Sequence, residues 1–313
     1  MNQKSVILDA TTLSSLMSCA RLTDLRYNRS LAPIGGKSNS LEVGSLVHKV
    51  LEGFYLSLAS GKERAVAIAK GMELGQLYIK SCPFCTGFNE PGKPPCGHKV
   101  NEYPGMQNTP ADSGKVDGRE QIGYNYALDT CQQYFDHYKN DSWIPILVEN
   151  TQSALLYEDE EIRILWKAKL DLTVDTNNGI YPVDHKTMKQ RRDTMSLNNQ
   201  FIGQCIVTKT RGVIINKIGF QSSLKPSEKF TRPLISYSLD RLTEWSQIIV
   251  PYYAKLMAVY DETGYWPPNF THCENKYGFC SFKSVCEADM SMREEELRIN
   301  FEIVPKWDIS NDD

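Results

Sequence analysis

The sequence predicts an α+β protein in which helices surround a small mixed sheet. Helical periodicity dominates the first 138 residues, and strand-like segments begin near residue 143. One helical pattern, a further strand and a long final helix follow, an order typical of an α+β core. Hydrophobic residues make up 41% of the chain and charged residues 23%, which is ordinary for a folded globular protein.

Individual elements follow from residue spacing. Amphipathic patterns predict helices over 11–27, 41–58, 63–79, 119–138, 196–210 and 239–263. Alternating or β-branched residues predict strands over 143–149, 162–174, 179–187 and 213–222. Thr176-Asn177-Asn178-Gly179 is typical of a hairpin turn, so the second and third of these strands should pair with each other.

Composition divides the chain into five parts. We expect N-terminal helices over 1–81, a Cys-, Pro- and Gly-rich insert over 82–118, a core over 119–265, a cysteine segment over 266–290 and an acidic tail over 291–313. The start of the chain lacks the pattern of a secretory signal, and no apolar run reaches the ~18–20 residues of a membrane span. We therefore expect a cytoplasmic protein with no membrane partner.

A set of charged residues on the predicted hairpin suggests phosphodiester chemistry. Asp171 ends one strand, and Asp184 and Lys186 share one face of the returning strand because strand side chains alternate. Two carboxylates on a common face suit Mg²⁺ or Mn²⁺. A nearby lysine can orient or deprotonate a water molecule and offset phosphate charge. The alternative is a surface ladder of charges on two strands.

Two groups of cysteines stand out among nine. Clustered thiols in a reducing compartment indicate metal or cluster ligands more than disulfides. One group is Cys273, Cys280 and Cys286. The other is Cys82, Cys85 and Cys96, which with His98 resembles a zinc knuckle, although a loop with reduced thiols remains the alternative. Cys131 and Cys205 are interpreted as ordinary buried residues.

A set of motifs occurs in order along the chain: Ser14-x-Leu16-x-x-Cys19, Gly44-x-x-x-His48, Asp171, Val183-Asp184-x-Lys186-Thr187, Gln200 and the C-terminal cysteines. In this order the motifs resemble those of RecB/AddB-type nucleases with the PD-(D/E)xK site, a family that includes the iron–sulfur exonucleases of CRISPR adaptation and phage relatives. They span the whole chain except the insert and the acidic tail. The resemblance implies a restriction-endonuclease-like core.

The resemblance also assigns roles within the site. It implies metal ligation by the side chains of His48, Asp171 and Asp184 and by the backbone carbonyl of His185. Lys186 would be the catalytic lysine, and Gln200 would contact DNA or orient that lysine. Glu149, near the end of the preceding strand, would be a further partner of the site.

Two positions depart from the family pattern. Ala168 replaces a glycine that precedes the first aspartate, which is a mild change. Gln204 replaces a tyrosine on the helix that starts near Gln200, so any stacking of that tyrosine on a base is lost while Gln204 stays on the expected DNA side. These changes affect the expected grip on substrate and not hydrolysis.

In the cysteine segment, the resemblance implies that Cys19 joins Cys273, Cys280 and Cys286. Four thiolates satisfy a [4Fe–4S] cluster and would equally satisfy tetrahedral zinc. Either group would clamp the N-terminal helix to the C-terminal segment.

Charge and resemblance together suggest the substrate. The net charge of −3 argues against a protein that merely coats DNA. Lys189, Arg191 and Arg192 follow the catalytic lysine directly and are predicted to contact phosphates, with a solvated loop as the alternative. Such contacts carry no sequence information.

We therefore expect a sequence-independent DNA exonuclease of a bacterial or phage-infected cell. It would act on single strands or DNA ends in recombination, repair or phage DNA processing. Any unwinding would come from a helicase or recombination partner, since the chain shows no helicase motif. A non-catalytic DNA-binding or assembly subunit, or a zinc-binding regulatory module, are the alternatives.

Overall fold

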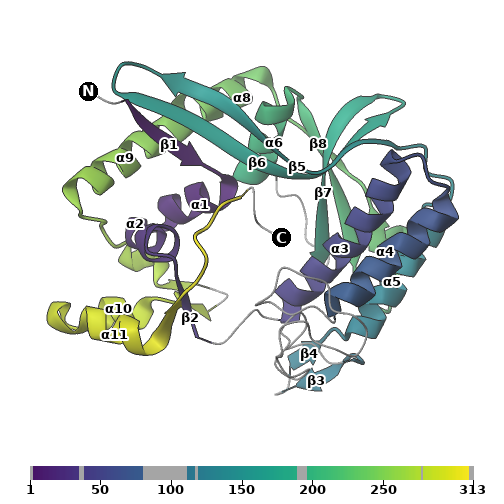
Figure 1. The fold of residues 1–313 in the computed structure, drawn as a ribbon, viewed down its shortest axis with the longest axis horizontal. Helices are drawn as coiled ribbons and strands as arrows, with labels where there is room; N and C mark the ends of the chain where they lie inside the picture. Colours follow the sequence, from purple (N-terminus) through teal and green to yellow (C-terminus); the bar gives the residue numbers. More distant parts are fainter. Residues whose placement is uncertain are drawn as a thin grey trace.

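The computed structural model of the chain describes residues 3–34, 39–79, 111–116, 119–188, 196–275 and 278–309. A seven-stranded mixed sheet has helices packed against it, so the predicted α+β arrangement is confirmed (Figure 1). Three two-stranded pairs, β11–β12, β13–β2 and β3–β4, lie outside this sheet. In the described part of the chain, no helix has the length and apolar character to cross a bilayer.

The elements have the following bounds. Helices are α1 Ala10–Ser18, α2 Ala20–Thr23, α3 Asn39–Ala59, α4 Arg64–Ile79, α5 Tyr124–His137, α6 Asn199–Thr208, α7 Pro226–Lys229, α8 Leu239–Glu244, α9 Val250–Thr263, α10 Lys283–Glu287 and α11 Arg293–Asn300. Strands are β1 Lys4–Leu8, β2 Leu31–Pro33, β3 Gly114–Val116, β4 Arg119–Gln121, β5 Ile144–Glu158, β6 Ile162–Thr176, β7 Gly179–Met188, β8 Gly212–Gly219, β9 Phe230–Thr231, β10 Leu234–Ser236, β11 Glu274–Asn275, β12 Gly278–Phe279 and β13 Phe301–Ile303.

Strand β6 is the centre of the large sheet because two strands share one of its edges. Antiparallel β5 covers the other edge, from Arg163 to Asp175. On the shared edge, β1 runs parallel to β6 over 162–166, and β7 pairs antiparallel with it over 172–176. Among the described residues no strand pairs with 167–171 on that edge. We call this stretch the β6 gap.

The rest of the sheet continues from β7. Strand β8 lies parallel to β7, and β9 and β10 pair antiparallel with β8. The β6–β7 connection is the predicted hairpin: the Thr176 hydroxyl accepts from the Asn178 amide and donates to the Gly179 carbonyl. Gly179 has a φ of +123°, a conformation that favours glycine.

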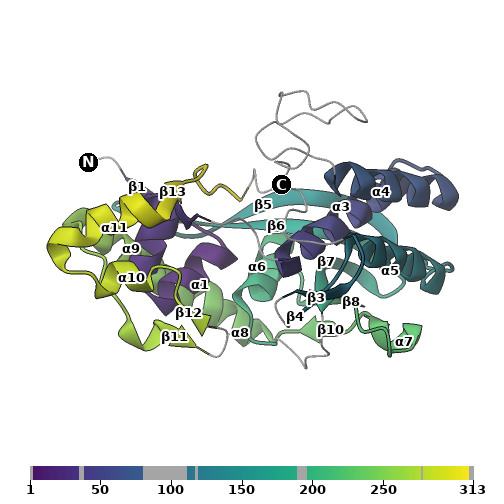
Figure 2. The same ribbon diagram turned by 90° about the horizontal axis from the view of Figure 1, so that it is seen from below.

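Helices cover the sheet in two hydrophobic clusters. The first contains α3, α4 and α5 packed on Leu172, Val174 and Val183. The second contains α6, α8 and α9 packed on the first part of β6, including the buried Trp166. Figures 1 and 2 show α3, α4 and α5 together at one end of the molecule and α1 and α9 at the other.

Several predicted boundaries differ from the structure. The helix expected over 119–138 begins only at Tyr124, because β4 occupies its first residues. The strand expected over 143–149 runs on to Glu158, and α8 continues into α9 through a π-helical turn, Trp245–Ile249. The short strand β1 is missing from the prediction.

The segment predicted as an acidic tail over 291–313 contains regular structure. Residues 293–303 form α11 and β13, and β13 pairs with β2. Leu297 of α11 and Phe301 of β13 are buried with Leu25 and Leu31 in a third cluster. These two apolar residues pack the segment against the molecule despite its high acidic content.

A steric prediction follows from the packing of α6 on the sheet. Gly203 faces Trp166 so closely that an added Cβ would overlap the indole ring. Gly203→Ala should therefore lower the free energy of unfolding by about 1–3 kcal/mol, despite the better helix propensity of alanine. Chemical denaturation measures this. Gly44→Ala on α3 is the matched control, because its Cβ would make only ordinary contact at 3.4 Å; equal stability of the two variants would contradict the prediction.

Candidate active site

A cavity of about 690 Å³ lies along the β6 gap. Most of its lining comes from the gap, the start of α1, the first half of α3, the end of β7 and the start of α6, and β5, α4 and the C-terminal segment contribute the rest. His48, Asp171, Lys186 and Gln200 all line it, together with the backbone neighbour His185. The structure thus brings the predicted site residues into one place, although they are spread over more than 150 positions of sequence.

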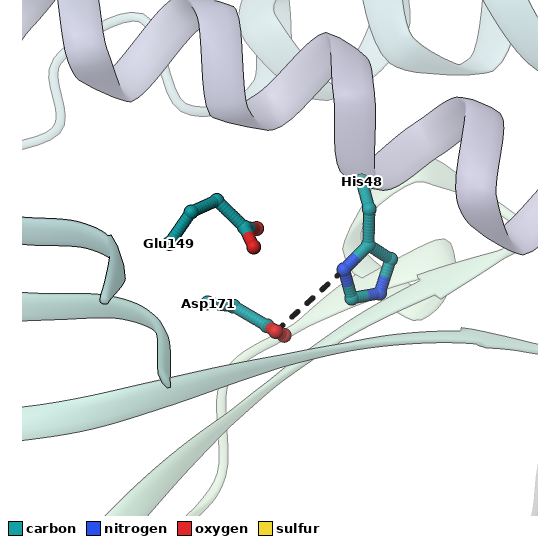
Figure 3. A group of neighbouring side chains, drawn as sticks. All are labelled: His48, Glu149 and Asp171. Atoms are coloured by element: carbon teal, nitrogen blue, oxygen red, sulfur yellow. Dashed lines mark ion pairs between the residues drawn. The ribbon is translucent and has the colours of Figure 1, made fainter. Parts of the chain in front are cut away.

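Three side chains form a group in which metal-ligating atoms lie within 4.8 Å of one another: His48, Glu149 and Asp171. His48 comes from α3, while Glu149 and Asp171 come from the neighbouring strands β5 and β6 (Figure 3). The His48 Nδ1 atom lies 3.6 Å from Asp171 Oδ1. Among the described residues no other group meets this spacing.

The orientation of the His48 ring follows from its second nitrogen. His48 Nε2 lies 3.0 Å from the carbonyl oxygen of His185. A carbonyl can only accept, so Nε2 donates, and in the neutral ring Nδ1 carries a lone pair. That lone pair faces Asp171, and the two repel unless a proton or a cation lies between them. The His185 carbonyl, predicted to be a metal ligand, accepts this hydrogen bond with one of its two lone pairs.

Glu149 lies opposite Asp171 in the sheet. The ladder pairs Val148 with Leu172 and Asn150 with Leu170, which leaves Glu149 and Asp171 facing each other between them. Glu149 has a φ of +46°, a conformation uncommon for a residue other than glycine. The strained backbone turns a carboxylate toward the cavity.

Burial, followed by the Asp171 carboxylate, raises the pKa of Glu149 to about 7, while His48 and Lys169 act in the opposite direction. The pKa of Asp171 is also raised, first by burial, with His48 opposing. Asp171 Oδ2 accepts a hydrogen bond of 2.7 Å from the amide of His185. Two carboxylates held this close, with little solvent, favour a bound positive charge.

The second half of the site is built around Asp184, which is fully buried. Its Oδ1 accepts from Gln200 Nε2 at 2.7 Å and from Gln204 Nε2 at 3.0 Å. Its Oδ2 lies 2.8 Å from Lys186 Nζ. Gln200 bridges Asp184 and Lys186, since its Oε1 also accepts a hydrogen bond from Lys186 Nζ at 3.0 Å.

The ion pair controls the charge of Lys186. Burial alone would lower its pKa, but the carboxylates of Asp184 and Asp171 outweigh burial and raise it. Lys186 is therefore a cation at the cavity wall, with 27% of its side chain exposed. Asp184 lies behind it and does not line the cavity. The predicted same-face pairing of these two residues agrees with their contact.

Gln204, predicted to lie on the DNA side, is a buried residue that also lines the cavity. Its Nε2 donates to Asp184 Oδ1 at 3.0 Å. Among the described residues its Oε1 has no hydrogen-bond partner. Gln204 therefore positions Asp184 at the edge of the cavity.

A buried polar network fixes the backbone between Asp184 and Lys186. Arg232 donates through Nε to Asn216 Oδ1 at 3.3 Å. Because arginine only donates, Asn216 Nδ2 must be the donor toward His185 Nδ1, 2.8 Å away. His185 is therefore neutral with its proton on Nε2, and burial holds its pKa well below the usual value.

Arg232 is itself held firmly. Its guanidinium lies between the rings of Tyr138 and Trp143, 3.5 Å from each ring centroid. It also donates to Asp141 at 2.7 Å and to the Tyr134 hydroxyl at 2.8 Å. A rigid cation thus orients Asn216, and Asn216 orients the strand that carries Asp184 and Lys186.

The donor set of the His48 group fits a hard divalent cation. Two carboxylates and one imidazole are the ligand types that Mn²⁺ accepts, and the carboxylates also suit Mg²⁺. The short distance from His48 Nδ1 to Asp171 and the raised pKa of Glu149 are the observations that support this fit. Asp184, predicted as a ligand, lies outside this group. Its Oδ1 accepts two hydrogen bonds from glutamines, while its buried Oδ2 has Lys186 as an ion-pair partner but no hydrogen bond among the described residues.

The four predicted cluster cysteines line a second, small cavity. Cys19 lies at the junction of α1 and α2, and the other three come from the segment between α9 and α11. All four are free thiols. Burial raises the pKa of the Cys273 thiol, and the neighbouring thiols of Cys286, Cys280 and Cys19 raise it as well. Residues far apart in sequence therefore meet here, as the resemblance implies.

The four sulfur atoms do not form a ligand group within 4.8 Å of one another. Tetrahedral zinc with Zn–S bonds of about 2.3 Å would hold its sulfurs about 3.8 Å apart.

Other predicted residues lie outside the described part of the chain. These are Lys189, Arg191 and Arg192 of the predicted phosphate loop and Cys82, Cys85, Cys96 and His98 of the predicted zinc knuckle.

Sequence reasoning missed several residues at the site. Lys167 and Lys169 line the cavity from the β6 gap, and Trp307 lines it from the C-terminal segment. The two lysines precede Asp171 at alternate positions, a signal that was visible in the strand pattern. Asn216 and Arg232 gave no signal, because their role depends on contacts between distant strands.

Comparison with known proteins adds little to this geometry. Neither a family model nor a curated protein matches the chain. Among solved structures, one titled "Crystal structure of SSO0001" aligns with 53% of this chain and 69% of its own, at 13% identity and a TM-score of 0.31. A likeness this distant carries no argument about fold or function.

Proposed function

We propose that this chain is a metal-dependent DNA nuclease with a PD-(D/E)xK-type site, acting as an exonuclease on single strands or DNA ends. One observation carries the proposal: the His48–Glu149–Asp171 group and the Lys186–Asp184 pair lie at one cavity. An anionic ligand group for a cation next to a fixed ammonium is what phosphodiester hydrolysis requires.

Each side chain has a distinct task in this scheme. His48, Glu149 and Asp171 would hold Mg²⁺ or Mn²⁺, which would supply positive charge to the scissile phosphate. Lys186 donates hydrogen bonds to a phosphate oxygen or to the attacking water. Asp184 keeps Lys186 charged, and Gln200 holds the lysine at a constant position. The Arg232–Asn216 network keeps the intervening backbone rigid.

Charge at the cavity favours a polyanionic substrate. Four lysines line it, from α3, the β6 gap and β7: Lys49, Lys167, Lys169 and Lys186. Lysines contact phosphates without reading base sequence, which supports cleavage without sequence specificity. A bound metal would neutralise the carboxylates among them and leave the cavity positive.

For the cysteine cavity, we propose a [4Fe–4S] cluster that clamps α1 to the C-terminal segment. Cys19 already accepts a hydrogen bond of 3.3 Å from the Asn269 amide, and Arg21 lies 3.8 Å from the Cys286 sulfur. Amide and guanidinium donors near sulfur stabilise thiolate charge. The clamp would be structural, since this cavity and the proposed catalytic cavity share no lining residue.

The first functional prediction concerns Lys186. Lys186→Ala should reduce cleavage of labelled single-stranded DNA in Mn²⁺ by about 10²-fold or more, because the charge beside the phosphate is lost. Circular dichroism should be unchanged. Lys255→Ala on α9, which removes a lysine outside the cavity lining, serves as the control with full activity. Wild-type rates in the Lys186→Ala variant would show that another site, or none, performs the chemistry.

Glu149 yields a prediction on stability and pH in metal-free protein. Its pKa is raised from 4.5 to about 7, so the folded state binds a proton that the unfolded state has lost. Stability therefore falls as pH rises from about 4.5 to 7, by up to about 3 kcal/mol. Glu149→Gln should remove that fall and be more stable than wild type at pH 8, but not at pH 4.

Denaturation of chelator-treated protein between pH 4 and 8 measures this difference. Adding Mn²⁺ at pH 8 should stabilise wild type more than Glu149→Gln, because the variant lacks one ligand. Glu158→Gln, an exposed residue of the same strand, is the matched control and should behave as wild type. Identical pH profiles for wild type and Glu149→Gln would remove Glu149 from the proposed metal group.

The cysteine clamp is tested by Cys19→Ser. It should lose iron, acid-labile sulfide and absorbance near 400 nm as fully as Cys280→Ser does, and it should unfold at lower temperature. Cys131→Ala, at a buried thiol remote from the cavity, should keep its iron. Full iron content in Cys19→Ser would refute the clamp, and stoichiometric zinc in wild-type protein would replace the cluster by a zinc site.

A further inference from the structure

The C-terminal segment Val304–Ile309 returns to the proposed catalytic cavity. In Figures 1 and 2 the chain that follows α11 and β13 runs back past α1 toward β6. The Val304 amide donates to the Ser30 carbonyl at 2.8 Å, which ties the start of the segment to the end of the β2–β13 pair. Trp307 and Ile309 line the cavity. We call Val304–Ile309 the strap.

Trp307 anchors the strap to the first helix. Its indole N–H donates to Asp9 Oδ2 at 2.8 Å, and its ring meets Tyr27 edge-on, with centroids 6.0 Å apart. Asp9 is buried, and its Oδ1 accepts from the Thr11 and Thr12 amides as the N-cap of α1. A hydrogen bond to a buried carboxylate is charge-assisted and strong. The strap and the start of α1 therefore act as one wall.

The strap also meets the floor of the cavity. Asp308 lies 3.8 Å from Lys167 of the β6 gap. Both side chains are partly exposed, 46% and 28%, so the pair is easily exchanged for another anion. A phosphate can take the place of Asp308 on Lys167, while the Trp307 anchor keeps the wall in position.

The two walls set the width of the cavity. The first half of α3 forms one side and the strap with α1 forms the other, above the β6 gap. A volume of about 690 Å³ is in the range of small-molecule pockets and too small for a duplex. An aromatic side chain with several lysines is the composition of channels for single strands.

We propose that the strap is the specificity determinant of this cavity. Held closed by the Trp307–Asp9 hydrogen bond, it admits one DNA strand, with Trp307 as a stacking surface for a base, and excludes a duplex. This inference rests on the proposed nuclease function. It assigns the choice between single and double strands to residues 304–309 and not to the catalytic group.

Three variants test the strap, and they differ in how much of the strap or of its anchor they remove. A stop codon at Val304 removes the whole strap, and Trp307→Ala removes the anchor and the aromatic surface. Asp9→Asn keeps an acceptor for the N-cap of α1 but presents an amide that cannot accept from the indole when its oxygen caps the helix. It therefore loosens the strap without uncapping α1, and its α1 should remain folded.

Each variant is tested with labelled single strands of 15 nucleotides and blunt duplexes of 15 base pairs. The rate of cleavage is measured for both substrates, and binding is measured by fluorescence anisotropy in Ca²⁺. Truncation and Trp307→Ala should raise the duplex-to-single-strand ratio at least tenfold in both readouts, and Asp9→Asn about threefold or more. Glu302→Gln, exposed on β13 just before the strap, is the control with an unchanged ratio.

The outcomes separate the two proposals. If wild type cleaves single strands and the truncated protein keeps the same ratio, the strap inference is overturned and the nuclease function stands. If wild type neither cleaves nor binds DNA, the proposed function fails and this inference falls with it. A ratio that rises in truncation and Trp307→Ala, but not in Glu302→Gln, supports the strap as the determinant.

Discussion

The site depends on one constraint, the sharing of a single edge of β6 by two strands. β1 leaves that edge at Trp166, and β7 joins it at Leu172. The five residues between them have no strand partner on that side among the described residues. A continuous sheet would bury this edge under neighbouring backbone and leave no space for ligand. Because β1 and β7 diverge, Lys167, Lys169 and Asp171 can line a cavity while the alternate residues Ala168 and Leu170 stay buried.

Next to this gap, the buried charge of Asp184 is balanced by two neutral amide donors and one ammonium group. A fully buried carboxylate such as Asp184 is costly unless it is paired and hydrogen-bonded. Two glutamine amides donate to its Oδ1, and the Lys186 ammonium forms an ion pair with its Oδ2, so that only Lys186 brings a formal charge. The neutral amides hold the pair in place without adding charge that would compete for a phosphate. Farther from the cavity, Arg232 holds Asn216 in place, and the charge of Arg232 is balanced by Asp141.

How far the sequence predicts the site depends on how local each contact is. Asp171, Asp184 and Lys186 could be predicted because a short turn and strand alternation determine their relation. Glu149 was only a secondary candidate, since its position opposite Asp171 depends on a long β5–β6 ladder with register shifts near both ends. Spacing alone does not reveal such shifts.

Contacts between residues far apart in the sequence were harder to predict. Cys19 was placed with the other cysteines by resemblance and not by pattern. β1 was missed because five residues with two buried side chains, Val6 and Leu8, carry too little periodicity. Trp307 lay in a segment whose acidity predicted solvent exposure, and only the docking of Leu297 and Phe301 brings that segment back to the molecule.

The parallel pairing of β1 with β6 has a consequence for synthesis on the ribosome. Lys4 pairs with Ile162, so the first strand emerges long before its partner exists. Until then Val6 and Leu8 have no sheet to cover them, and the strand presents an unpaired edge to other chains. Contacts this far apart in sequence also slow folding. The nascent chain must therefore keep β1 from aggregating until residue 166 has left the ribosome, and only then can the gap that forms the site exist.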